Sequence, residues 1–176
     1  MRYAAFLRAV NLGRNRRVTG AELKRLFEAA GADEVSTFRT SGNVVFEAPR
    51  DITRKLEAEL EKALGHEMVI FTRDARALKK IAAAEPFPPA EVESSKGKLQ
   101  VLLLGDAPSA ADRKKVLGLA TDEDRLAFGD RELFWLPSGG TQGSTLDTKA
   151  IADILGKTTQ RTMGTIEALT AKFFAT

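Results

Sequence analysis

The chain has 176 residues, of which 43% are hydrophobic, and its 27 basic and 24 acidic side chains give a net charge of +3. This composition is typical of a globular protein and is compatible with one domain or two small ones. The chain has no cysteine and a single histidine, His66, which excludes disulfides, thiolate nucleophiles and multi-histidine metal sites. We therefore expect neither a metal nor a cofactor.

The cellular location is predicted from what the chain lacks. No apolar run approaches the roughly 18 to 20 residues that a membrane-spanning helix needs. Arg8 interrupts the only apolar stretch near the N-terminus, which is not the layout of a signal peptide. A chain without cysteine also fits a reducing compartment. These features predict a soluble, cytoplasmic protein with no membrane partner.

Turn signals and hydrophobic periodicity predict the order βαββαβ for the first part of the chain. Leu23, Phe27 and Ala30 recur at helical spacing, and Thr19 with Glu22 has the pattern of a capping box. The predicted elements are a strand at 2–10, a helix at 19–30, a hairpin with strands at 35–39 and 43–47, a helix at 51–64, a strand at 67–73 and a helix at 74–84.

The pattern then restarts after a proline-rich stretch, which predicts a linker at 85–98 between domains at 1–84 and 99–176. The second part is predicted as βαββα without an evident last strand. The segment 157–162 leads instead to a C-terminal helix. The fold class is therefore α+β, with duplicated split-βαβ (ferredoxin-like) units. The predicted elements are strands at 99–104, 125–128 and 133–136, and helices at 109–120, from Ser144 to 155 and at the C-terminus.

Several predicted strands carry apolar residues on both faces, as in Leu99–Leu104. A single ferredoxin-like sheet has helices on one face only, so burial of both faces needs a further layer. Three arrangements remain open: the halves pack on each other, they continue one sheet, or a partner covers them, as in a homodimer.

The predicted topology brings three polar segments to one edge of the first sheet. These are the exit of the first strand at 11–17, the hairpin turn at 40–43 and the turn at 65–66. Arginine forks bind phosphate and carboxylate oxygens in pairs, and the helix that starts near Thr19 adds the positive end of a dipole. We therefore predict an anion site with Arg8, Asn11, Gly13, Arg14, Arg16, Arg17, Ser41, Gly42 and Asn43, and His66 as a secondary member.

Each of these residues also has a structural explanation. Arginines at loop ends are commonly solvated, Arg8 has Glu47 as an alternative partner, and His66 fits an ordinary turn. The loop at 137–144 is open to two interpretations. Its glycines and hydroxyls suit an anion cradle ahead of the helix expected at Ser144, and they equally suit a flexible connector.

Motifs of several known chemistries are missing. Gly13 is not followed by a P-loop pattern, and there is no Gly-x-Ser-x-Gly elbow. The carboxylates of Glu57, Glu59 and Glu61 lie on a charged helix and are interpreted as a solvated face. RNA-recognition modules share the βαββαβ order, but Ser41 and Asn43 occupy the positions of their stacking aromatics. No catalytic residue is therefore assigned, although phosphate binding remains compatible with the sequence.

The chain resembles the uncharacterised family called domain of unknown function 1697. The resemblance is carried by residues 6–13, by residues 41–46 and by scattered matches toward the C-terminus. It implies a duplicated α+β fold and a bacterial, intracellular protein, and it implies no activity. Ala9 and Arg14 replace usual glycines. The polar residues that match the family pattern are Arg8, Asn11, Ser41, Asn43, Ser144 and Arg161, which adds Ser144 and Arg161 as secondary site members.

Three functions are compatible with these observations. The leading hypothesis is binding of a phosphorylated or polyanionic ligand, which includes nucleic acid, through the arginine-rich loop. The alternatives are a protein-interaction or oligomerisation module with an open edge at Leu99–Leu104, and an enzyme that acts on a small anionic substrate.

Overall fold

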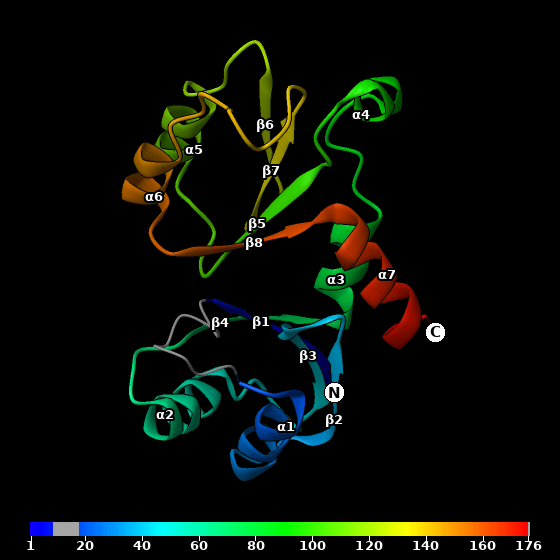
Figure 1. Cartoon of the computed structure of the whole chain (residues 1–176), viewed down its shortest axis with the longest axis vertical. Helices are drawn as coiled ribbons and strands as arrows, with labels where there is room; N and C mark the ends of the chain where they lie inside the picture. The colour runs from blue at the N-terminus through cyan, green and yellow to red at the C-terminus, as the bar shows by residue number, and fades with distance from the viewer. Residues whose placement is uncertain (9–17, 176) are drawn as a thin grey trace. The chain divides into compact units, whose positions relative to one another are not determined.

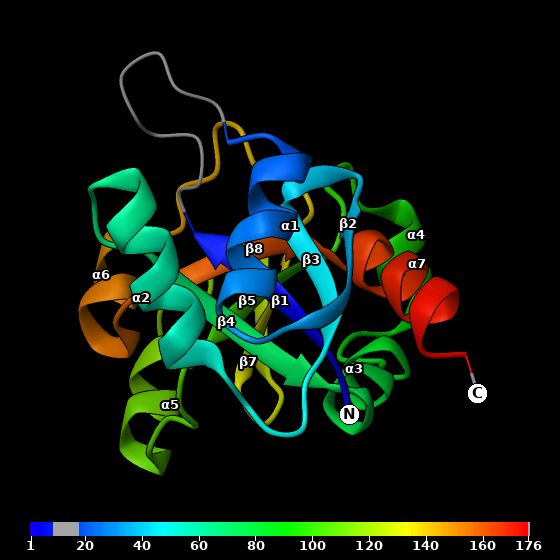
Figure 2. The same cartoon turned by 90° about the horizontal axis from the view of Figure 1, so that it is seen from below.

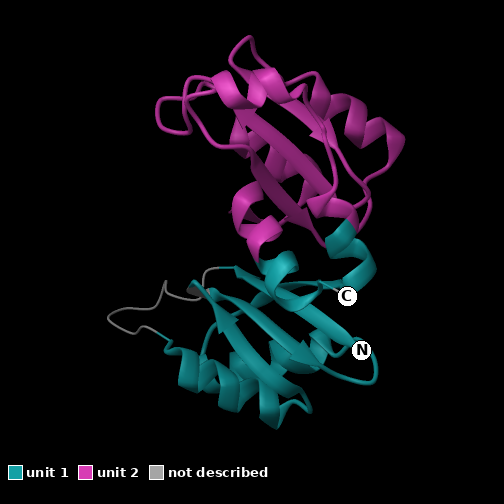
Figure 3. Cartoon of the chain, turned by 90° about the vertical axis from the view of Figure 1, so that its right-hand side faces the viewer, with its two compact units in different colours: residues 1–79, 169–176 teal, residues 80–168 magenta. Residues whose placement is uncertain are grey.

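The computed structural model describes residues 1–8 and 18–175, apart from the side chains of Thr40 and Ser41. The chain divides into two compact units, residues 1–79 with 169–176 and residues 80–168 (Figure 3). Each unit contains one four-stranded sheet. Among the described residues, no helix has the length and apolar character needed to cross a membrane.

The first unit has the predicted order βαββαβ. Its strands are arranged β2-β3-β1-β4, and each neighbouring pair is antiparallel, which is the order of a split βαβ unit. Helices α1 and α2 cover one face of this sheet (Figure 1; Figure 2). The elements are β1 (Arg2–Arg8), α1 (Gly20–Ala29), β2 (Asp33–Phe38), β3 (Thr40–Glu47), α2 (Thr53–Leu64) and β4 (Val69–Asp74).

An aromatic cluster joins the sheet of the first unit to its helices. Phe46 of β3 stacks on Tyr3 of β1 with ring centroids 5.5 Å apart, and it meets Phe27 of α1 edge-on, also at 5.5 Å. Leu23 and Leu56 extend this core, and both are fully buried. The helical spacing of the apolar residues in α1 is therefore explained by one buried stripe.

Carboxylates of α2 close the outer edge of β4. Glu61 Oε1 accepts a hydrogen bond from the backbone N–H of Met68 at 3.1 Å, and Glu57 Oε2 accepts one from Ile70 at 3.0 Å. β4 is an edge strand, so without these bonds its amides would be open to pairing with another strand. The interpretation of Glu57 and Glu61 as a merely solvated face was therefore wrong.

The second unit repeats the order βαββαβ with strands arranged β6-β7-β5-β8, all antiparallel. Helices α5 and α6 lie side by side against it (Figure 1). Its elements are β5 (Gln100–Leu104), α5 (Ala110–Leu117), β6 (Asp124–Phe128), β7 (Glu132–Pro137), α6 (Thr148–Leu155) and β8 (Thr158–Thr162).

Two predictions for the second unit were wrong. It does have a last strand, β8, whose sequence TTQRT contains no apolar residue and so gave no hydrophobic signal. β5 is not an open edge either, since it pairs with β7 on one side and β8 on the other. The open-edge form of the interaction hypothesis therefore loses its basis.

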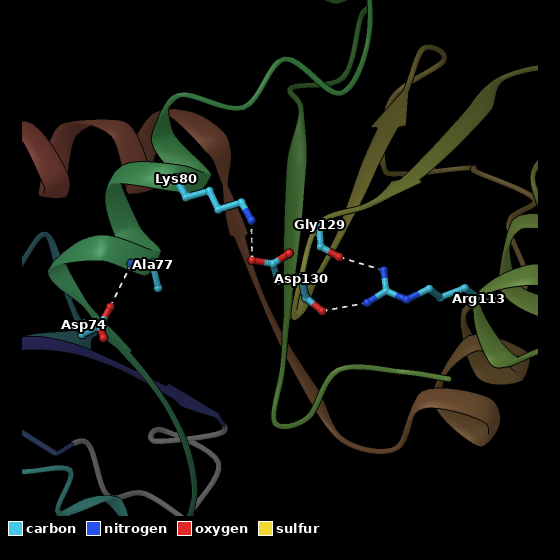
Figure 4. Close-up of polar contacts among 6 residues, drawn as sticks. All are labelled: Asp74, Ala77, Lys80, Arg113, Gly129 and Asp130. Atoms are coloured by element: carbon cyan, nitrogen blue, oxygen red, sulfur yellow. Dashed lines mark hydrogen bonds and ion pairs between the residues drawn. The ribbon is translucent and has the colours of Figure 1, made fainter. Parts of the chain in front are cut away.

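Three further helices accompany the two units: α3 (Ala75–Ala82), α4 (Pro89–Ser94) and α7 (Met163–Phe173). Asp74 caps α3, with its Oδ1 accepting from the Ala77 N–H at 2.8 Å (Figure 4). The stretch predicted as a linker contains α4, and the last residues of α7 belong to the first unit. The predicted domain boundaries stay a prediction, because compact units are not yet independently folding domains.

Side chains fix the β6–β7 hairpin at its turn. Arg113 of α5 donates from Nη1 to the Gly129 carbonyl and from Nη2 to the Asp130 carbonyl, both at 2.8 Å. On the other side of the turn, Lys80 Nζ lies 2.7 Å from Asp130 Oδ2 (Figure 4). The fork geometry of the guanidinium suits it to hold two adjacent carbonyls at once.

Replacing Leu23 with alanine tests the core of the first unit. Leu23 is fully buried in α1, so Leu23→Ala is expected to lower the free energy of unfolding by about 2–5 kcal/mol. Leu117 in α5 is 42% exposed and provides a matched control, and Leu117→Ala should cost no more than about 0.5 kcal/mol. Urea denaturation followed by circular dichroism measures both. Equal losses would contradict this description of the core.

Candidate functional site

Strand register brings the three predicted segments to one edge of the first sheet. Arg8 at the end of β1 lies opposite Val69 at the start of β4. On the other side of β1, Phe6 lies opposite Asn43, just after the β2–β3 turn. The exit of β1, the hairpin turn and the turn before β4 therefore meet at this edge, as the topology predicted.

Part of the predicted anion site lies outside the described residues. This holds for Asn11, Gly13, Arg14, Arg16 and Arg17, and for the side chain of Ser41. Their participation in a site stays a prediction that rests on the sequence. The described residues show where the segment that carries them leaves the sheet, after Arg8, and where the chain enters α1, at Val18 and Thr19.

Arg8 is exposed at the last position of β1. The alternative pairing of Arg8 with Glu47 was wrong. Glu47 Oε1 instead lies 2.9 Å from Nη2 of Arg2, at the opposite end of β1. The register explains this choice, since Arg2 and Glu47 are directly opposite one another on β1 and β3. The Arg8 side chain thus stays at the edge where the three turns meet.

Asn43 has a structural role in the hairpin. Its side chain is only 2% exposed, and its Nδ2 donates to the Phe38 carbonyl at 3.2 Å. Gly42, beside it, is half-buried. This bond spans the turn between β2 and β3 and fixes its shape. Asn43 therefore explains how the turn is held, and direct contact with a ligand stays a prediction for it.

The structure adds two cations that the sequence analysis did not place at this edge. The guanidinium of Arg39 lies 5.1 Å from the centre of the Phe38 ring, and Lys172 Nζ lies 5.8 Å from the same ring. Both side chains are exposed. The ring of Phe173 meets that of Phe38 edge-on, with centroids 6.0 Å apart. We call Phe38, Arg39, Lys172 and Phe173 the basic-aromatic cluster.

The signal for Arg39 was present in the sequence but was assigned to the wrong element. The sequence analysis predicted Arg39 as the last residue of the strand at 35–39, whereas β2 stops at Phe38 and β3 begins at Thr40. Arg39 adopts a left-handed backbone with φ of 61°, which places it in the turn itself. Lys172 is far away in sequence, and only the return of α7 to the first unit brings it to Phe38.

The turn before β4 contains His66. Gly65 ends α2 with a left-handed φ of 77°, a conformation that glycine adopts at little cost. His66 follows it, is half-buried, and has its Nδ1 3.1 Å from the Glu67 carbonyl oxygen. This geometry is that of a turn residue. Among the residues that the structure describes, it gives His66 no acid or base partner that would indicate catalysis.

The start of α1 agrees with the predicted cap. The hydroxyl of Thr19 accepts a hydrogen bond from the Glu22 N–H at 3.1 Å, and the helix begins at Gly20. A helix N-terminus carries a partial positive charge and unpaired N–H groups. It follows directly after the arginine-rich segment, so it contributes to the same positive potential.

Ser144 has a structural explanation in the second unit. Its hydroxyl donates to Asp124 Oδ1 at 2.8 Å, and the indole Nε1 of Trp135 donates to the same oxygen at 2.9 Å. The hydroxyl of Thr121 donates to Asp124 Oδ2 at 2.7 Å. The helix expected at Ser144 starts later, because Asp147 is the residue that caps α6. We call Asp124 with its three donors the Asp124 network.

The Asp124 network keeps this carboxyl group ionised despite its burial. Burial by itself raises the pKa of Asp124, but the hydrogen bonds from Thr121, Trp135 and Ser144 outweigh this effect and lower the pKa below its usual value. An ionised carboxylate accepts stronger hydrogen bonds than a neutral group does. The network thereby anchors the loop before α6 to β6 and β7.

Arg161 lies on β8, opposite Val101, on the sheet face away from the Asp124 network. Its Nη1 donates to the Thr159 hydroxyl and to the Gln160 carbonyl, both at 2.8 Å. Burial lowers the pKa of Arg161 to about 10. Within the second unit the structure therefore places Ser144 and Arg161 on different faces. No group of three or more potential metal-ligating side chains occurs in the described part of the chain.

Asp124→Asn tests the network. We expect a loss of about 1.5–3 kcal/mol in unfolding free energy at pH 7, because hydrogen bonds to a charged acceptor are replaced by weaker ones. The pKa of Asp124 is lower in the folded state than its unfolded value of about 3.9. The stabilisation that the ionised Asp124 carboxylate provides is therefore fully present above the unfolded pKa. It is lost as the pH falls through the folded pKa.

The measurement is urea denaturation of both proteins at a series of pH values from 7 to 3. The difference between wild type and Asp124→Asn should shrink in acid. The neighbouring Asp122 is exposed, and Asp122→Asn serves as the control with no comparable loss. A difference that stays constant down to the lowest pH would show that the charge of Asp124 is not what stabilises the loop.

The comparisons with known proteins agree with this fold. A solved structure of the conserved bacterial protein SP0830 from Streptococcus pneumoniae matches with a TM-score of 0.65 and 19% sequence identity, covering 98% of each chain. At this identity the likeness shows a shared fold. No curated protein matches the chain. The model of a family described as protein of unknown function (DUF1697) matches residues 1–134. The resemblance seen in the sequence is thus confirmed, and the chain belongs to the DUF1697 family.

Proposed function

We propose that this protein binds a phosphate-bearing polyanion, with nucleic acid as one such ligand, at the edge of its first sheet. The observation that carries the proposal is the meeting of three turns at the end of β1 where Arg8 is exposed. The arginine-rich segment with Arg14, Arg16 and Arg17 leaves the sheet from this same point. A cellular ligand of this class also suits the cytoplasmic location that we propose.

The basic-aromatic cluster supports the same proposal. Arg39 and Lys172 flank Phe38, so the hairpin turn carries positive charge in addition to that of Arg8. Exposed cations that come from separate elements along one edge can contact several phosphates of an extended ligand at once. Phe38 and Phe173 are half-buried, and aromatic rings beside cations are a common feature of sites for single-stranded nucleic acid.

A small anionic substrate is less well supported than a polyanion. Ligand sites for small molecules are usually concave and enclose most of the ligand. The cavity found in the second unit is lined by none of the cations named above. The described residues at this edge come from strand ends and turns of separate elements, which suits an extended ligand.

The proposal is tested by fluorescence polarisation with labelled random oligonucleotides, single-stranded and duplex, over a series of salt concentrations. Inorganic polyphosphate as a competitor separates charge recognition from recognition of nucleic acid. The triple variant Arg14→Ala, Arg16→Ala, Arg17→Ala should weaken binding and reduce the slope of log K against log salt. Each lost phosphate contact contributes about 0.7–0.9 to that slope. The double variant Arg8→Ala, Arg39→Ala should act in the same direction.

Matched controls remove equal charge elsewhere. Lys114, Lys115 and Lys149 are exposed on α5 and α6, and their triple replacement by alanine should leave the slope nearly unchanged. Equal effects of the two triple variants would show that binding depends only on net charge. No binding of any oligonucleotide at low salt would exclude nucleic acid, and if labelled polyphosphate does not bind either, the wider class is excluded.

A further inference from the structure

The second unit contains a cavity of about 120 Å³ between its sheet and α6. Leu133 and Trp135 of β7 form part of its wall, and both are buried. Ile151 of α6 faces it from the helix side. Interiors of proteins rarely leave spaces much larger than a water molecule, so a cavity of this size calls for an explanation.

The duplicated fold explains how the cavity arises. The second helix of the first unit, α2, has 12 residues, whereas its counterpart α6 has 8. In the first unit Ile70 of β4 lies opposite Leu7 and belongs to the core. At the corresponding place in the second unit, Thr158 of β8 lies opposite Leu104. A shorter helix and a smaller, polar side chain leave part of the sheet uncovered.

The cavity wall is fixed before any ligand arrives. Trp135 is the only tryptophan of the chain, and its indole N–H is bound to Asp124 in the Asp124 network. This bond holds the ring in one orientation while its apolar face lines the cavity. A preorganised wall lowers the entropic cost of binding a ligand. The Asp124 network therefore holds the wall of the cavity in place, as well as the loop before α6.

The lining indicates the chemical class of the ligand. It contains no charged side chain, and its polar members are Thr148, Thr158 and Gln160. Thr148 and Gln160 are exposed, which places polar groups at the mouth of an otherwise apolar cavity. A dry apolar cavity of about 150 Å³ is known to hold a benzene ring. The space here is therefore suited to a ligand with a compact apolar body.

We infer that the second unit binds a small neutral molecule that combines a planar or branched apolar body with one hydrogen-bonding group. The apolar body occupies the space against Trp135, Leu133 and Ile151, and the polar group lies near the threonine hydroxyls at the mouth. This site is separate from the polyanion site, since the two share no residue, and either proposal can fail without the other.

The test uses three fluorinated probes, followed by ¹⁹F NMR: fluorobenzene, 4-fluorophenol and 4-fluorobenzoate. The first two should bind saturably with dissociation constants below about 1 mM, and 4-fluorophenol should bind more tightly. The carboxylate of 4-fluorobenzoate should weaken binding, because it loses hydration at a mouth whose lining offers no cation as a partner. The single indole N–H signal of Trp135 in ¹⁵N-labelled protein should shift with the same saturation.

Two variants assign the binding to the cavity. Ala152 lies at the mouth on α6 and is exposed, so Ala152→Phe should block the cavity and weaken binding at least tenfold. Ala111 on α5 is also exposed and does not line the cavity, and Ala111→Phe should bind as the wild type does. Thr158→Val keeps the shape of the side chain and should remove the preference for 4-fluorophenol over fluorobenzene.

Three results would overturn the inference. The first is that neither neutral probe binds up to about 5 mM. The second is that Ala152→Phe binds them as well as the wild type does while its circular dichroism shows a folded protein. The third is that 4-fluorobenzoate binds as tightly as 4-fluorophenol, which would point to a site with different chemistry.

Discussion

The central position of β1 is the constraint on which the candidate site depends. β1 is hydrogen-bonded to β3 on one side and to β4 on the other, and a strand in that position has its register fixed twice. A shift by one residue would turn Tyr3, Ala5 and Leu7 away from the core of the first unit. Because that core holds the register, it also determines that Arg8 ends beside both turns. The location of the polar edge thus follows from apolar packing several residues away.

The two units show how one topology supports different surfaces and interiors. In the first, long helices and the stacked rings of Tyr3, Phe27 and Phe46 fill the space over the sheet. In the second, the helices are shorter and a buried carboxylate takes part in fixing Trp135. The two units therefore share one backbone topology. Their side chains decide whether the space over the sheet is filled by a packed core or contains a cavity. The exposed cations of the candidate site that the structure describes lie at the surface and outside the core, at the end of β1 (Arg8), on a turn (Arg39) and near the end of α7 (Lys172).

Much of the fold was predictable because the spacing of apolar residues along the chain reflects which side chains are buried. Leu23 and Phe27 mark α1, and the same reasoning found most of the helices and strands, although not α4. β8 was missed because Thr158 and Gln160 line a cavity and its mouth instead of a filled core, so the strand lacks the usual apolar alternation. The meeting of the three turns followed from topology alone. The contact of Lys172 with Phe38 could not be predicted in this way, since the two residues are 134 positions apart in the numbering.

For Ser144 the sequence suggested one role and the structure shows another. A hydroxyl in a glycine-rich loop suits an anion, and only the structure reveals Asp124 as its partner.

The division of the chain into units has a consequence for synthesis. The first unit includes residues 169–176, and Arg2 near the start of the chain donates from Nη1 to the carbonyl of Phe173 at 2.7 Å. A ribosome releases these last residues only after the whole of the second unit has been made. Domains usually fold in the order in which they emerge, but here the first unit to emerge completes its packing last. During that interval the ring of Phe38 lacks Phe173, its edge-on partner in the finished structure. A nascent chain of this protein thus keeps its first unit unfinished until the end of α7 has been made.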